Sequence, residues 1–99
     1  MPIETTATGK FDTPWKIAGT DASDIEFRDA TVEDLCKAEE EGNPSLHPYA
    51  FNVALAAETC VRAGNYTGPF TPGHFRKMSQ KRWAVVRKTM NEAAELGEG

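Results

Sequence analysis

Long apolar runs are absent from this chain of 99 residues, and so are the features of a secretory leader. No apolar stretch approaches the roughly 18 residues that span a bilayer. The first ten residues, MPIETTATGK, contain neither a basic region nor an apolar one. Only two cysteines occur, Cys36 and Cys60, and both fall on apolar faces of expected helices. We therefore expect a cytosolic protein without a membrane span and with two reduced, buried thiols, while a disulfide between them stays open.

Patterns that bind metals or carry out catalysis are absent as well. His47 and His74 are the only other soft metal ligands, and the four side chains stand 11 to 14 residues apart, without a close pair. The sequence also lacks a phosphate-binding glycine loop, a nucleophile elbow and a pair of carboxylates that converges with a histidine. We predict that the protein is not an enzyme and has no catalytic residues, no metal and no cofactor.

The charged residues are unevenly distributed, although the net charge is only −4. Residues 1–58 hold 12 acidic and 4 basic side chains, whereas residues 59–91 hold 7 basic side chains and no acidic one. Such a division predicts either two halves that neutralise each other within the fold or two surfaces that face different partners. Internal neutralisation is the simpler interpretation.

The first part of the chain has the two-residue period of β-strands. Residues 11–18 and 25–28 form two strand-like segments around a turn of small and polar residues at 19–23. The pattern predicts a β-hairpin that rests on helices, because two strands alone are only marginally stable in water. Residues 1–9, polar and rich in threonine, are expected to form a flexible arm. The apolar face of the hairpin consists of Trp15, Ile17, Ile25 and Phe27.

Helical periodicity dominates the remainder of the chain. Thr31, with Asp34 three residues later, predicts a capping box at the start of a helix over residues 32–41. A second, largely buried helix is expected over residues 48–63, then a short helical turn over residues 71–78, and a last helix over residues 80–96. The sequence thus predicts a single α+β domain over residues 10–97. In it, an N-terminal β-hairpin packs on a small bundle of three helices plus the short helical turn.

Glu58 is unusual because the expected second helix places it within an apolar arc. A buried carboxylate needs a cationic partner, and Arg62, one helical turn later, and Arg87 on the last helix are the candidates. We therefore predict a structural ion pair of Glu58 with Arg62 or Arg87 that joins these two helices. The alternative is a solvated pair of Glu58 and Arg62 that contributes roughly a few tenths of a kcal/mol.

The last helix carries the residues that we expect to contact a partner. Lys81, Val85 and Lys88 lie opposite its expected core stripe, with Arg82 at the edge. The stripe consists of Trp83, Val86, Met90, Ala93 and Ala94. A basic face with one apolar residue suits an amphipathic, acidic helix of another protein. The same segment, preceded by a short helical turn, also imitates a helix-turn-helix unit that binds DNA through phosphate contacts. The pI of 5.1 disfavours the nucleic-acid alternative.

Five segments follow one another in an order that is typical of a known family. They are a Thr-Pro strand at residues 11–14, the junction FRDATVEDL at 27–35, an Ala-rich helix at 50–61, a turn begun by Thr-Pro at 71–78, and a helix with an early aromatic residue at 79–83. In this order they resemble the phage tail assembly chaperones of the Mu-like, contractile-tailed type. Two features depart from the pattern, since Ala30 replaces a usual proline and the loop at 65–69 is longer.

The resemblance implies a non-catalytic protein of the host bacterial cytoplasm. Members of this family are implied to coat the tape measure protein during tail assembly and to be absent from the finished particle. The tape measure protein is therefore the expected partner, self-association and a longer frameshifted form stay open, and no membrane partner is expected. The competing function is a small DNA-binding regulator that uses the basic last helix.

Overall fold

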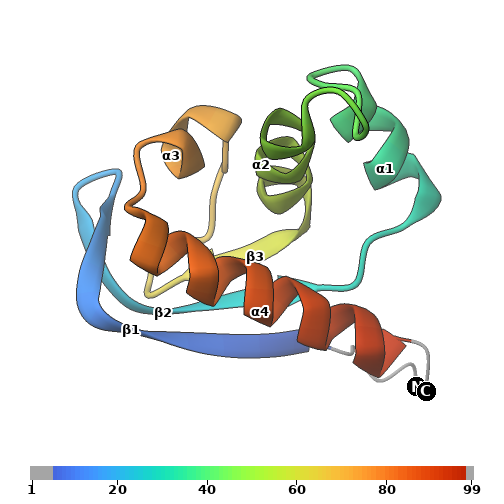
Figure 1. Ribbon diagram of the computed structural model, residues 1–99. Coiled ribbons are helices and arrows are strands. Elements are labelled where there is room, and N and C mark those ends of the chain that lie inside the picture. Colours follow the sequence, from blue (N-terminus) through green and yellow to red (C-terminus); the bar gives the residue numbers. More distant parts are fainter. Residues whose placement is uncertain (1–5, 98–99) are drawn as a thin grey trace.

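The computed structural model describes residues 6–97 and confirms the predicted α+β class (Figure 1). A three-stranded antiparallel sheet has the order β1-β2-β3, and helices α2, α3 and α4 lie on one side of it. The strands are β1 (Thr6–Ile17), β2 (Thr20–Arg28) and β3 (Cys60–Ala63). The helices are α1 (Val32–Glu39), α2 (Pro48–Thr59), α3 (Pro72–Arg76) and α4 (Gln80–Gly97).

The N-terminal hairpin is longer than predicted. Its turn consists of Ala18 and Gly19 alone, with φ angles of 49° and 78°, the two positive values that a type I′ turn requires. The prediction of a flexible arm over residues 1–9 is wrong for residues 6–9, because they pair with residues 25–28 of β2. Ala7 points into the core, and threonine is a good strand former, so this polar segment joins the sheet. Residues 1–5 of that prediction lie outside the described residues.

The predicted apolar face of the hairpin is confirmed. Its four side chains are at most 5% exposed, and Ala7, Phe11 and Ala22 extend the same buried face. Phe75 of α3 packs among them, with its ring centroid 5.3 Å from that of Trp15 and 6.4 Å from that of Phe27. A helix of only five residues is thereby anchored by one buried aromatic side chain.

A large irregularity interrupts the pairing of β1 with β2. The register passes from Lys10↔Asp24 to Trp15↔Ala22, so four residues of β1 stand opposite one residue of β2. Pro14 lies in this bulge, where the missing N–H group costs no ladder hydrogen bond. Arg82, in the first turn of α4, donates hydrogen bonds to the carbonyl oxygens of Thr13 (3.2 Å) and Pro14 (3.1 Å). The bulge therefore holds the beginning of α4.

The third strand was not predicted, since residues 60–63 were assigned to the end of the second helix. The helix ends at Thr59, and Cys60 adopts extended backbone angles. Residues 60–63 then pair with β2, where Ala63 faces Ile25 and Arg62 faces Glu26. The apolar residues of such a short segment fit either period, and the pairing with β2 decides between them.

Neither cysteine has the predicted environment. Cys36 lies on the exposed side of α1, because this helix buries Asp34 and Ala38 instead. Cys60 lies on β3 rather than on a helix and is half-buried, and burial raises the pKa of its thiol to about 12. Both cysteines are free thiols.

Helix α4 covers β1 and β2 through the predicted stripe, of which Val86, Met90 and Ala93 are buried. Trp83 is only half-buried, and Ala94 is exposed. Thr89 is buried as well, because α4 approaches the backbone of β1 closely at Gly9. A Cβ atom at Gly9 would overlap Oγ1 of Thr89 and would lie 3.0 Å from Cγ1 of Val85.

We predict that Gly9→Ala lowers the free energy of unfolding by about 1–3 kcal/mol, because α4 must shift to accommodate the methyl group. Thr89 cannot easily yield, since its hydroxyl donates a 2.7 Å hydrogen bond to the carbonyl of Val85. Urea denaturation followed by circular dichroism measures the change. Gly73→Ala is the matched control, because a Cβ there meets nothing closer than Oγ1 of Thr71 at 3.6 Å. Equal stability of the two variants would contradict the close contact.

Candidate functional site

The predicted contact face of α4 is divided by the fold. Lys81 and Lys88 are exposed, as predicted, and Lys81 forms a solvated ion pair with Asp12 at 3.4 Å. Arg82 is half-buried and bound to the β1 bulge. The prediction is wrong for Val85, which packs on the core beside β1. Helix α4 buries a wider arc than one stripe because it contacts both β1 and β2.

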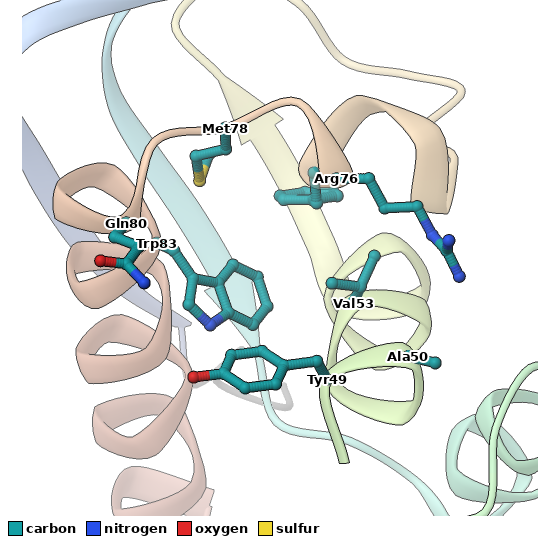
Figure 2. Close-up of a pocket in the computed structure, with 8 residues that line it drawn as sticks. Tyr49, Ala50, Val53, Arg76, Met78, Gln80 and Trp83 are labelled. Atoms are coloured by element: carbon teal, nitrogen blue, oxygen red, sulfur yellow. The ribbon is translucent and has the colours of Figure 1, made fainter. Parts of the chain in front are cut away.

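An apolar groove lies between α2, α3 and α4 and was not predicted from the sequence (Figure 2). Its volume is about 310 Å³, within the range of small ligand pockets. Trp83 of α4 points toward α2, where Tyr49 and Val53 lie opposite. Met78 borders the groove between α3 and α4, and Arg76 and Gln80 provide polar groups at its rim.

Tyr49 is the most accessible aromatic side chain of the groove, with 71% of its surface exposed. An exposed tyrosine at the start of a helix that is otherwise largely buried is a usable sequence signal, since Tyr49 directly follows Pro48. The partner across the groove, Trp83, is 34 positions away in the sequence. The periodicity of α4 assigns Trp83 to the core stripe and gives no sign that Trp83 also borders the groove.

A second cavity of about 520 Å³ lies next to the groove, between the end of the hairpin and the connection of α3 to α4. Met78 borders both spaces. The polar side chains that line the second cavity are all basic, and no acidic residue lines it. They are Lys16, His74, Lys77 and Arg82. We call this cavity the basic cleft.

The predicted ion pair of Glu58 is not formed. Glu58 is exposed, and no basic group of residues 6–97 lies within 4.0 Å of its carboxylate. Arg62 lies on β3 instead of on the helix, and it binds Asp24 at 2.9 Å and Glu26 at 2.8 Å on β2. Arg87 does connect α4 to α2, but it donates its hydrogen bond to Asn52, at 3.1 Å. The early end of α2 at Thr59 explains the difference.

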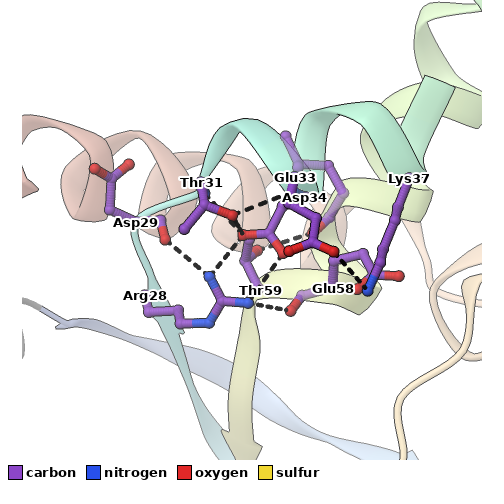
Figure 3. A network of polar contacts seen from close by, with 9 residues as sticks. Arg28, Asp29, Thr31, Glu33, Asp34, Lys37, Glu58 and Thr59 are labelled. Atoms are coloured by element: carbon purple, nitrogen blue, oxygen red, sulfur yellow. Dashed lines mark hydrogen bonds and ion pairs between the residues drawn. The ribbon is translucent and has the colours of Figure 1, made fainter.

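Arg28 and Asp34 form the most buried ion pair among the described residues (Figure 3). The guanidinium donates two hydrogen bonds to the carboxylate, at 2.7 and 3.1 Å, and further ones to the carbonyl oxygens of Asp29 and Glu58. Thr31 completes the capping box, as predicted. The pair therefore ties the end of β2 to the start of α1 and to the last turn of α2.

Arg28 lowers the pKa of the Asp34 carboxyl from 3.8 to about 2, although burial acts in the opposite direction. The hydrogen bonds from Thr31 lower this pKa further. Every polar contact of Asp34 is thus accounted for by helix capping and by the ion pair.

Within residues 6–97, no group of three histidine, cysteine or carboxylate side chains is arranged to hold a metal ion. Among the helices of that same part of the chain, none combines the length and the apolar character that a membrane span requires. Comparison of the chain with protein-family models, with curated proteins and with solved structures found no match.

We predict that Arg62→Ala destabilises the fold by about 1 kcal/mol, whereas Glu58→Gln changes the stability by less than about 0.5 kcal/mol. Arg62 bridges two carboxylates and attaches β3 to β2, but Glu58 faces solvent. Thermal unfolding of both variants at pH 7 tests this difference. If Glu58→Gln lowered the stability as much as Arg62→Ala does, that result would instead support the buried ion pair of Glu58 that the sequence predicts.

We predict that Asp34→Asn lowers the stability at pH 7 by about 1–2 kcal/mol. Because the folded-state pKa of Asp34 lies below its unfolded value, its stabilisation is complete above about pH 4 and is lost as the pH falls toward 2. The variant should therefore lose stability less steeply than the wild type between these pH values. Glu33→Gln, in the same helical turn but with 78% of its side chain exposed, is the control and should behave as the wild type.

Proposed function

We propose that this protein is a non-catalytic phage tail assembly chaperone that binds and shields the tape measure protein in the bacterial cytoplasm. The observation that carries the proposal is the open apolar groove between Tyr49 and Trp83. Protein surfaces that expose aromatic side chains around a groove are typical docking sites for another chain. The segment order described for residues 11–83 supports the choice of partner.

The proposed mechanism is the docking of a partner helix in the groove. An amphipathic helix presents apolar side chains at positions i, i+3, i+4 and i+7, and a groove between helices accepts one or two of them. Each copy then binds weakly, because the groove is small. Many copies along one long helical partner would cover its apolar stripe, and local release would stay easy.

The alternative is a DNA-binding regulator that uses α4. Lys81 and Lys88 are exposed on this helix, which favours the alternative. Two contacts disfavour the alternative. Arg82 donates hydrogen bonds to carbonyl oxygens of β1, and Lys81 forms an ion pair with Asp12. Helix α4 also packs along the sheet, which limits how deeply it could enter a major groove.

We predict that Tyr49→Ala weakens binding to the co-expressed tape measure protein by about tenfold, because aromatic residues of a binding groove contribute most of its affinity. Leu46→Ala is the matched control: Leu46 is also highly exposed, at 75%, but it does not line the groove. The control should bind within about twofold of the wild type. Affinity capture from co-expressing cells, followed by titration of the purified proteins, measures both effects.

Two results would overturn the proposal. One is a failure of the wild type to bind the tape measure protein at any salt concentration. The other is binding to duplex DNA that collapses between about 50 and 200 mM salt, which is the behaviour of a phosphate-binding regulator. Circular dichroism of Tyr49→Ala verifies that a loss of binding does not come from unfolding.

A further inference from the structure

The apolar groove and the basic cleft are neighbours in the fold and share one lining residue, Met78. A helix bound in the groove would therefore bring its flanking side chains close to the cleft. The groove supplies aromatic and aliphatic contacts, and the cleft supplies cations that come from three separate parts of the chain. Lys16 lies at the end of β1, Lys77 follows α3, and Arg82 lies in the first turn of α4.

The cations around this surface are poorly neutralised from within the fold. No carboxylate of residues 6–97 lies within 4.0 Å of the charged groups of Lys16, Lys77 or Arg76. Asp21 faces Lys16 across the hairpin, but the two residues form no ion pair at this distance. By contrast, Arg28, Arg62 and Lys81 are all paired with carboxylates. Part of the excess of basic residues along the sequence is thus exposed on this surface.

We propose that the segment bound by this surface is an amphipathic helix whose apolar stripe is flanked by acidic residues, with the stripe in the groove and the carboxylates at Lys16 and Lys77. Charge complementarity carries this choice, because a cationic rim beside an apolar groove favours an acidic partner and repels a basic one. The proposal deepens the proposed function, on which it rests for the identity of the partner, by stating the chemistry of the segment that binds.

Two other occupants are less well matched to the surface. Duplex DNA would bind the cations through its phosphates but would leave the apolar groove empty. A second copy of the chain could present α1, whose exposed side carries Val32 and Leu35 together with Glu33. Both occupants are distinguished by the experiment below.

The test uses three synthetic peptides of about 20 residues, long enough to form a helix. They share one leucine stripe, and the positions that flank the stripe are glutamate, glutamine or lysine. Fluorescence anisotropy of labelled peptide with the full chain should give the tightest binding for the glutamate peptide. We expect its dissociation constant to be about tenfold lower than that of the lysine peptide, and the difference to shrink as salt rises from about 50 to 500 mM.

Charge-reversal variants locate the effect. The double variant Lys16→Glu/Lys77→Glu should abolish or reverse the preference for the glutamate peptide. Lys10→Glu/Lys88→Glu changes the net charge equally at exposed positions outside the cleft and should keep the preference. Tyr49→Ala should weaken all three peptides by a similar factor, because it removes only the apolar contact.

Several outcomes overturn the inference. They are equal affinities for the three peptides, an equal effect of the two double variants, and binding of a duplex or single-stranded oligonucleotide that Lys16→Glu/Lys77→Glu abolishes. Concentration-dependent self-association that the same variant abolishes, without binding of the glutamate peptide, overturns it in favour of a second copy. The peptides contain no tape measure sequence. A failure to bind the tape measure protein would therefore not change how the peptide result is interpreted, and a failure to bind the peptides would not by itself overturn the proposed function.

Discussion

The contact of α4 with β1 is the constraint on which the rest of the structure depends. Three points along the helix hold it in place, two of them on β1 and the third at Asp29, which follows β2. Arg82 binds the carbonyl oxygens of the β1 bulge at one end, and Gly9 lets Thr89 approach the strand in the middle. At the other end, Gly97 lies so close to Asp29 that a Cβ would overlap the carboxylate. A side chain larger than glycine at position 9 would push α4 away from β1.

The groove is a consequence of this fixed position. With α4 packed on β1, the hydrogen bond of Arg87 to Asn52 connects α4 to α2, while Phe75 fills the core beside the sheet. Nearer the start of both helices, no side chain of the described residues fills the space between Tyr49 and Trp83. The packing that closes the core therefore also leaves the groove open between these two aromatic side chains.

The parts of the fold that could be predicted are those in which a local residue pattern is compatible with only one kind of secondary structure. The alternation of Trp15 and Ile17 with polar residues identified the inner face of the sheet, and Thr31 with Asp34 identified the start of α1. The strand β3 could not be predicted, because its four residues continue the apolar pattern of α2 and only the pairing with β2 makes them extended.

The candidate site was harder to predict than the fold for a related reason. A helical wheel assumes one buried direction, but α4 faces the strands on one side and α2 on the other. Val85 was therefore assigned to solvent although it packs against the core. Trp83 was assigned to the core, which it does contact, but it also borders the groove. Which half-buried aromatic residue is accessible depends on how neighbouring elements meet, and no local period contains that information.

The basic residues of the sequence are neutralised in one region of the fold and left without a carboxylate partner in another part of the described residues. Arg62 and Lys81, from the basic segment, pair with carboxylates of the acidic half, as internal neutralisation requires. Lys77 and Arg76 come from the same segment but are exposed, and no carboxylate of residues 6–97 lies within 4.0 Å of their charged groups. Exposed cations of this kind influence association rate and partner choice more than affinity. A surface that selects by charge and holds by one small groove would bind the correct helix quickly and still let it go, which is the balance that reversible shielding of a partner demands.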